Sequence, residues 1–191
     1  RGLADVGGPA NVTIVSCSAH RDYEFRNMEE ISKSEGINAV DLYMKIVRDG
    51  GAGVVCHSMK DADISMFYRQ PWVMVSSDGG IGSRHPRGAG TYPRVLGRFV
   101  RDSGWLTLPE AVRKMTSLPA HRFNLKDRGL IKRGFKADVV VFDPRRVIDR
   151  ATFQDPQLLS EGVRHVFVNG VEVWGGGKVT GERPGRALRR T

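Results

Sequence analysis

The chain has 191 residues, of which 40% are hydrophobic and 27% are charged, as in a globular protein with one domain or a part-domain and a small second one. No apolar run approaches the roughly 20 residues of a membrane-spanning helix, so no membrane association is expected. The formal charge of +9 permits nucleic-acid binding. However, the basic residues are scattered and no recognised binding motif accompanies them, so nucleic acid is not an expected partner.

Three apolar runs in the first 76 residues predict strands, because β-branched residues fill them and turn-forming or polar residues bound them. The predicted strands are 12–17, 53–57 and 72–76. Apolar residues at helical spacing occupy the intervals, and the predicted helices are 27–35, 39–48 and 61–69. The order strand, helix, strand over residues 53–76 is typical of a parallel βαβ unit.

Two of these helices have apolar residues gathered on one face. In 39–48 the residues that recur at intervals of three and four are Val40, Tyr43, Met44 and Val47. In 61–69 the residues expected to point inward are Ile64, Phe67 and Tyr68.

A group of polar residues follows the third predicted strand. Asp78 stands at its end, and after a glycine-containing loop come His85 and Arg87, which frame a proline. An aspartate after a strand is often only a turn or helix cap. In α/β barrels, however, catalytic groups are mounted on the loops at the carboxyl ends of strands. His57 ends the preceding predicted strand, so it is a further candidate for the same cavity.

The rest of the chain changes character near residue 125. Helices are predicted over 93–101 and 109–115, the second with Pro109 in its first turn. Beyond them lie short apolar runs, which predict a small β module over 130–131, 137–142, 165–168, 171–174 and 178–179. Asn169-Gly170 has the sequence of a tight hairpin turn.

Several of these segments carry a family resemblance that runs from about Asn11 to the end of the chain. They are Ser77-Asp78-Gly79, His85-Pro86-Arg87, Gly90-Thr91-Tyr92-Pro93-Arg94-Val95-Leu96, Lys114-Met115-Thr116-Ser117-Leu118-Pro119-Ala120, Arg128-Gly129-Leu130-Ile131, Ala137-Asp138-Val139-Val140-Val141-Phe142-Asp143-Pro144 and Val166-Phe167-Val168-Asn169-Gly170. Together they resemble the N-acyl-D-amino-acid deacylases (D-aminoacylases) of the amidohydrolase superfamily.

The resemblance implies an α/β fold. Residues 1–125 would form the last strands and helices of a metal-dependent-hydrolase (β/α) barrel, with a small α/β insertion near 11–50. Residues 126–191 would form the carboxyl-terminal part of a small β-sandwich and a basic tail.

The resemblance also implies a zinc-dependent hydrolase that cleaves the amide bond of N-acyl-D-amino acids, giving a D-amino acid and a carboxylate. Asp78 matches the family's general base, which then serves as the acid and is also a candidate contact to the metal. Arg87 matches the arginine that holds the substrate's carboxylate. His85 and His57 are assigned to the substrate side. Each has a plainer interpretation: a cap for Asp78, a loop-bracing salt bridge for Arg87, and turn or scaffold roles for the histidines.

The family's main metal ligands are a His-x-His pair, a bridging cysteine or similar ligand and two further histidines, all upstream of the matched region. This chain contains no His-x-His. The zinc ligands are therefore expected outside it, and the chain alone is expected to be inactive, as the carboxyl-terminal portion of a longer enzyme.

An alternative is a non-catalytic subunit or truncated interaction module that completes another chain's barrel through an exposed strand edge at 12–17. In both interpretations the chain needs a missing amino-terminal half or an oligomeric partner. Cys17 and Cys56 are too few for a disulfide framework, so both are expected to be buried thiols in a reducing cytoplasm.

Overall fold

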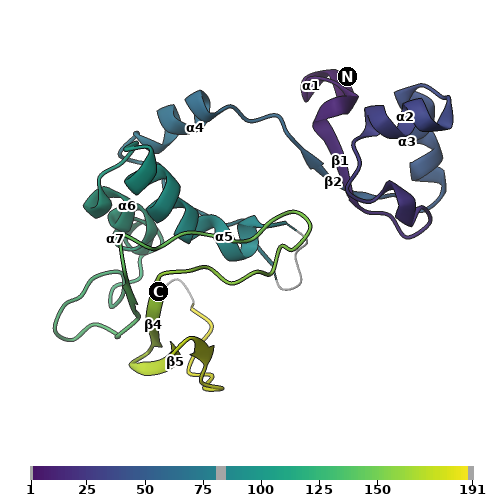
Figure 1. Ribbon diagram of the computed structural model, residues 1–191. Helices are drawn as coiled ribbons and strands as arrows, with labels where there is room; N and C mark the ends of the chain where they lie inside the picture. Colours follow the sequence, from purple (N-terminus) through teal and green to yellow (C-terminus); the bar gives the residue numbers. More distant parts are fainter. Residues whose placement is uncertain (1, 81–84, 189–191) are drawn as a thin grey trace.

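The computed structural model describes residues 2–80 and 85–188 (Figure 1). Residues 81–84 of the loop after Asp78, and the last residues of the basic tail, lie outside this range. Figure 1 shows an amino-terminal unit to one side, joined by an extended segment to a group of helices and then to a small sheet. Among the described residues, no helix is both long and apolar enough to cross a membrane.

The amino-terminal unit is built on two strands, β1 (Val12–Ser16) and β2 (Gly53–Cys56), which pair antiparallel. Two helices, α2 (Met28–Glu35) and α3 (Ala39–Arg48), lie between them in the chain, together with a short helix η2 (Arg21–Tyr23). A short helix α1 (Gly2–Asp5) and a 3-10 turn η1 (Pro9–Asn11) precede β1. The core of the unit is Val12, Ile14, Cys17, Tyr23, Met28, Ile31, Leu42 and Ile46.

Local capping explains where α2 begins and ends. The side chain of Asn27 accepts a hydrogen bond from the backbone N–H of Glu30, and the Glu30 side chain accepts one from the backbone N–H of Asn27. The helix ends at Gly36, which adopts a left-handed φ of 66° that glycine takes without a Cβ penalty. The sequence prediction of this helix is confirmed.

The helix α3 is confirmed, but the apolar face that its residue spacing indicates is not the face that packs into the core. The side chains that enter the core are Leu42 and Ile46. The four residues chosen from the sequence, Val40, Tyr43, Met44 and Val47, are each more than half exposed. This helix has two apolar stripes, and in the described part of the chain only one of them packs into the core, so spacing alone could not choose between them.

The parallel βαβ unit predicted over residues 53–76 is also wrong. β2 pairs antiparallel with β1, and residues 72–76 form no strand, although they are extended. The backbone N–H of Val75 donates instead to the carbonyl of Lys114, 3.2 Å away. The ladder partner of β2 is β1, and the segment before Asp78 is attached to a helix, so the two runs do not share a sheet among the described residues.

The helical part contains α4 (Asp61–Tyr68), α5 (Arg87–Arg94), a π-helical stretch η3 (Val95–Asp102), α6 (Leu108–Met115) and α7 (Ser117–Arg122). Its core is Val75, Val95, Phe99, Leu106 and Ala111, with Ile64 and Tyr68 of α4 packed against it as predicted. Phe67 is 57% exposed, so its predicted inward orientation is wrong.

The helix predicted from residue 93 in fact begins at Arg87, and Pro93 lies inside it. Because proline has no N–H, it cannot make the usual hydrogen bond four residues back, and the wider π-helical turns of η3 follow directly. The start of α6 agrees with the sequence: Thr107 caps it and Pro109 lies in its first turn.

The carboxyl-terminal sheet is antiparallel, in the order β3 (Val139–Phe142), β4 (Val163–Val168), β5 (Val171–Gly175) and β6 (Lys178–Val179). Asn169 and Gly170 join β4 to β5 with φ of 50° and 84°, which confirms the predicted hairpin turn. Residues 130–131 form no strand, so that prediction is wrong. The buried-thiol expectation holds for Cys17 but not for Cys56, which is exposed.

Candidate active site

Asp78 lies at the end of the extended segment that leads away from α4. Its side chain is 79% exposed, and Arg87 Nη2 is 2.7 Å from its Oδ2. Arg87 Nε also donates to the backbone carbonyl of Asp78, at 3.1 Å. The φ of Asp78 is 46°, a left-handed conformation that Asp and Asn tolerate better than most residues. Arg87, in the first turn of α5, therefore holds both the carboxylate and the backbone of Asp78.

The loop approaches the start of α5 very closely. A Cβ atom on Gly79 would come within 2.6 Å of the Cα atom of Gly88, so only glycine allows the two backbones to meet there. Gly79 also donates its N–H to the Ser77 hydroxyl, 3.2 Å away. This close approach allows the first residue of α5 to reach Asp78.

His85 lies directly before the helix, and its Nδ1 accepts a hydrogen bond from the backbone N–H of Arg87, at 3.1 Å. Burial, and then the guanidinium groups of Arg87 and Arg94, lower the pKa of His85 below its ordinary value. The ring is therefore neutral at neutral pH, which agrees with an accepting Nδ1. His85 orients the start of α5 and with it Arg87.

His57 follows β2, and its Nε2 is hydrogen-bonded to the Thr13 hydroxyl, at 3.2 Å. The rings of His57 and His85 are brought together by a residue that sequence reasoning missed, Phe153. Its ring makes edge contacts with both imidazoles, at centroid distances of 5.5 Å to His57 and 5.2 Å to His85. Phe153 lies in a turn between β3 and β4, with no local pattern that would have singled it out.

The segment that carries Phe153 is fastened at its base. Ile148 and Glu161 form an isolated antiparallel bridge, with backbone hydrogen bonds of 3.2 and 2.9 Å. Arg150 donates from two nitrogens to the Glu161 carboxylate, at 2.9 Å each. Residues 149–160 therefore form a closed loop rather than a free connection.

The same segment is attached to the helix that carries Arg87. Arg94 donates to the Asp149 carboxylate from Nε at 2.9 Å and from Nη2 at 2.6 Å, and the Asp149 side chain is only 7% exposed. Arg101 Nη1 donates to the carbonyl of Val147 at 2.7 Å. A Cβ on Gly97 would lie 2.5 Å from that same carbonyl oxygen, so the close contact requires glycine.

Lys114 holds the segment before Asp78. Its side chain is fully buried, and its Nζ donates to the carbonyl oxygens of Gln70 and Val73, the latter at 3.0 Å. Burial lowers the pKa of this lysine, while the Glu110 carboxylate, 3.8 Å away, acts in the opposite direction. The sequence marked Lys114 only as part of a family segment, and the structure shows what it binds.

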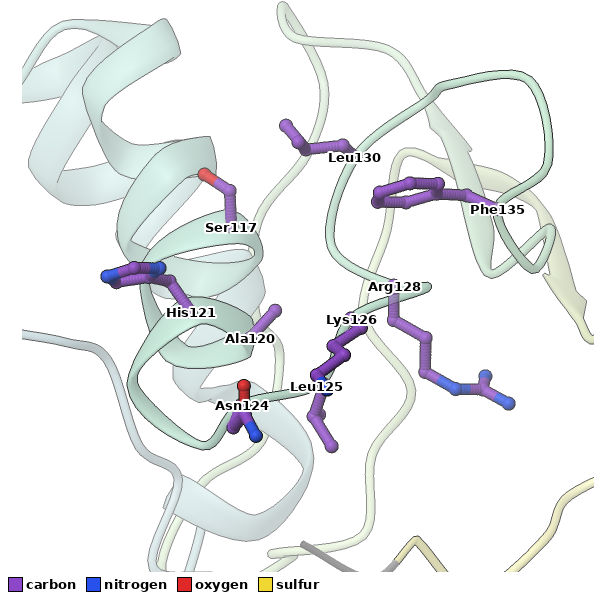
Figure 2. A pocket seen from close by; sticks show the side chains of 9 residues that line it. All are labelled: Ser117, Ala120, His121, Asn124, Leu125, Lys126, Arg128, Leu130 and Phe135. Atoms are coloured by element: carbon purple, nitrogen blue, oxygen red, sulfur yellow. The ribbon is translucent and has the colours of Figure 1, made fainter. Parts of the chain in front are cut away.

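Two cavities lie elsewhere in the molecule. One, of about 220 Å³, lies between α7 and the following loop. Figure 2 shows that its Arg128 guanidinium points away from the cavity, whose walls include Ala120, Leu130 and Phe135. The other, of about 630 Å³, lies between α5 and the sheet and is mainly apolar. Neither of these two is lined by Asp78, His85 or Arg87, and the side chains of Asp78 and Arg87 are themselves exposed.

The described residues do not form a metal centre by themselves. Over 2–80 and 85–188, no group of three or more His, Cys, Asp or Glu side chains could hold a metal ion. At the candidate site the donors are one carboxylate, already paired with Arg87, and two imidazoles in contact with Phe153. This donor set does not fit a zinc site, which needs at least three protein ligands.

A family model described as "Amidohydrolase family" matches residues 69–174, more than half of the chain. The chain belongs to this family. It is 38% identical to a D-aminoacylase and 40% identical to an N-acyl-D-glutamate deacylase, both from Alcaligenes xylosoxydans xylosoxydans. These alignments cover 95% and 94% of this chain, but only 38% and 36% of the relatives. The chain thus spans less than two fifths of their length.

Solved structures of related deacylases also match this chain. The N-acyl-D-glutamate deacylase from Bordetella bronchiseptica, complexed with zinc and a phosphonate inhibitor that mimics the tetrahedral intermediate, superposes with a TM-score of 0.85 at 36% identity. The match covers 98% of this chain and 39% of that one. A D-aminoacylase structure matches with a TM-score of 0.81 at 38% identity, over 90% of this chain and 36% of that one. These comparisons confirm the resemblance read from the sequence and an α/β amidohydrolase fold.

Proposed function

We propose that this chain is the carboxyl-terminal portion of a zinc-dependent enzyme that hydrolyses N-acyl-D-amino acids to a D-amino acid and a carboxylate. Residues 1–125 would belong to its barrel, with the insertion near 11–50, and residues 126–191 to its β-sandwich. The likeness to three deacylases over most of this chain supports the activity. The observation that carries the proposal is the exposed Asp78 carboxylate, held 2.7 Å from the Arg87 guanidinium beside His85.

Asp78 is the proton carrier in this proposal. Amide hydrolysis needs a base to take a proton from the attacking water and an acid to return it to the leaving amine nitrogen. An exposed carboxylate can do both in turn. The products balance: water supplies the hydroxyl of the new carboxyl group and the proton of the amine.

Arg87 is the anchor for the substrate's α-carboxylate. Its side chain is 46% exposed and its guanidinium carries several donors, so it can bind a second carboxylate while it remains near Asp78. His85 positions Arg87 through the hydrogen bond at its Nδ1. His57 and His85 lie on the substrate side, against Phe153.

Zinc would be held mainly by residues outside this chain. Asp78 is the residue of this chain that we propose as an additional ligand, and the described donors around it do not complete a site. Bound by those other residues, zinc would supply Lewis acidity. The two cysteines are unpaired, which is consistent with the reducing cytoplasm proposed as the enzyme's location.

The test compares the intact protein, as its own gene encodes it, with the 191-residue chain. Both are assayed for deacylation of N-acetyl-D-methionine and for zinc by elemental analysis. The intact protein should contain zinc and turn over the D substrate, and the chain alone should do neither. Stoichiometric zinc and turnover by the chain alone, or an inert intact protein, would contradict the proposal.

One observation favours the alternative, a non-catalytic module that completes another chain. The apolar stripe of α3, formed by Val40, Tyr43, Met44 and Val47, is exposed in the described structure. If this alternative holds, light scattering will show the intact protein in a stable complex with another chain. The same preparation will show no deacylation.

A further inference from the structure

We infer that Lys114 is a positioning residue for Asp78: by bonding the backbone of the segment that leads to Asp78, it fixes where that carboxylate stands relative to the substrate. This inference rests on the proposed function, in which Asp78 carries the proton. It adds to that function a residue that acts through another. The contacts that support it belong to residues 70–75, which connect α4 to Asp78.

Three backbone groups of this segment are bonded by one residue of α6. Lys114 Nζ donates to the carbonyl oxygens of Gln70 and Val73, the latter at 3.0 Å, and the Lys114 carbonyl accepts the N–H of Val75 at 3.2 Å. The Val75 side chain is buried in the core of the helical part. The segment is therefore fixed at three points, the last of which is three residues before Asp78.

The preceding residue of α6 adds a weaker attachment to the same segment. Arg113 Nη2 donates to the Pro71 carbonyl at 2.5 Å, and the guanidinium also binds the Glu110 carboxylate at 2.8 and 2.9 Å. The Arg113 side chain is 36% exposed, whereas that of Lys114 is fully buried. Water can replace the bond of Arg113, but it does not reach the bonds of Lys114.

A buried lysine is a costly way to stabilise a fold. Removing its amino group from water costs free energy, and an apolar side chain of similar volume often stabilises a protein as well or better. The Glu110 carboxylate is 3.8 Å from Nζ, too far for a short hydrogen bond. What Lys114 adds is a set of directional bonds to two carbonyl oxygens, and these define the path of the backbone.

Asp78 is thus held from both sides. Arg87 binds its carboxylate and its backbone carbonyl from the start of α5, and Lys114 fixes the chain that arrives from α4. The Asp78 side chain is exposed, so packing alone does little to place it. A general base must lie within hydrogen-bond reach of the proton it takes, and a misplacement of about 1 Å can cost about a hundredfold in rate. Loss of the Lys114 bonds should therefore affect the reaction through Asp78.

The experiment is a double-mutant cycle of Lys114→Met and Asp78→Asn in the intact protein, with steady-state kinetics on N-acetyl-D-methionine. Methionine keeps most of the length of lysine but has no N–H donor. Lys114→Met alone should lower kcat by about ten- to a hundredfold and leave KM within about twofold, because the Arg87 anchor lies on α5. In the Asp78→Asn background it should lower kcat by less than about twofold, because the base that it positions is already gone.

Two further variants separate placement from stability. Lys114→Arg keeps N–H donors but holds them in a longer planar fork, so it should lower kcat less than Lys114→Met does. The same cycle is measured with it, so the test does not depend on the folding of the methionine variant. Lys45→Met is the matched control, since this lysine donates to the Tyr23 hydroxyl and the Glu35 carboxylate, both at 2.8 Å, in the amino-terminal unit. It should lower the melting temperature but not kcat.

The contrary outcomes distinguish the inference from the proposed function. If a Lys114 variant lowers kcat by the same factor in both backgrounds, or leaves kcat unchanged in the wild-type background, Lys114 is only structural and the proposed function still stands. A wild-type protein that deacylates no N-acyl-D-amino acid, or an Asp78→Asn variant with near-normal turnover, would overturn the proposed function and the inference together.

Discussion

Two arginine–aspartate pairs in this molecule have the same chemistry but different surroundings. Arg87 and Asp78 lie at the candidate site, with side chains 46% and 79% exposed. Arg128 and Asp138 lie beside the carboxyl-terminal sheet, with side chains 12% and 36% exposed. Exposed ion pairs contribute about 0–1 kcal/mol to stability. Disturbing the first pair on substrate binding should therefore cost the fold little stability.

The second pair belongs to a network that the first lacks. Arg128 also donates to the Asn169 side chain, at 2.7 Å, and the backbone N–H of Asn169 donates to Asp138, at 2.8 Å. The Asn169 amide donates in turn to the carbonyl of Pro184, at 2.8 Å. This network joins three family segments, the one at residue 128, the one before β3 and the β4–β5 turn. The additional partners, rather than the residue types, make one pair structural and leave the other available for chemistry.

The largest expected effect is on turnover. In the intact protein, Asp78→Asn should lower kcat by about two to four orders of magnitude, because it keeps the shape of the side chain but removes the base. Asparagine also tolerates the left-handed φ of 46° at this position, so folding should not change. Steady-state kinetics and thermal melting measure the two effects. Near-normal turnover with a lowered melting temperature would show that Asp78 is only a turn residue.

The next effect is on substrate binding. Arg87→Lys should mainly raise KM, because lysine cannot make the two parallel hydrogen bonds of a guanidinium with a carboxylate. The expected loss is on the order of 1.5–3 kcal/mol for hydrogen bonds to a charged group. If kcat falls instead while KM is unchanged, the α-carboxylate does not bind at Arg87.

The smallest expected effect is on stability and concerns the structural pair. Asp138→Asn should lower the free energy of unfolding by about 1–3 kcal/mol, because two half-buried partners, Arg128 and Asn169, lose a charged acceptor. The matched substitution, Asp78→Asn, should change it by no more than about 0.5 kcal/mol, as is usual for surface positions. Urea unfolding of both variants measures the difference. Equal losses would show that the network adds nothing to the second pair.

The same aspartate predicts a pH dependence. Burial raises the pKa of Asp138, but the backbone N–H of Asn169 and the Arg128 guanidinium outweigh it, so the net pKa lies below the ordinary 3.8. A depressed carboxyl pKa stabilises the fold above the ordinary value, and the stabilisation is lost as the pH falls through the folded-state pKa. Wild-type stability should therefore fall further than that of Asp138→Asn on acidification below about pH 4. If acid lowers the free energy of unfolding of the two proteins by the same amount, this prediction is wrong.

Features set by neighbouring residues could be predicted from the sequence. The Asn169-Gly170 turn, the first turn of α6 at Pro109 and the ends of α2 depend on backbone preferences and short-range capping. The cluster of Asp78, His85 and Arg87 could be predicted for the same reason, because its members are fewer than ten residues apart. The family resemblance also came from such short segments, and the comparisons confirm it.

Features set by distant residues were decided only by the tertiary structure. The antiparallel pairing of β1 with β2, the buried stripe of α3 and the bonds of Lys114 depend on partners far along the chain. So does the contact of Phe153 with His85, across 68 positions of the sequence. Local patterns record which side chains are apolar or charged, but they do not record which of several compatible partners gives the best packing. The partners are chosen when the whole chain packs into a close-packed interior.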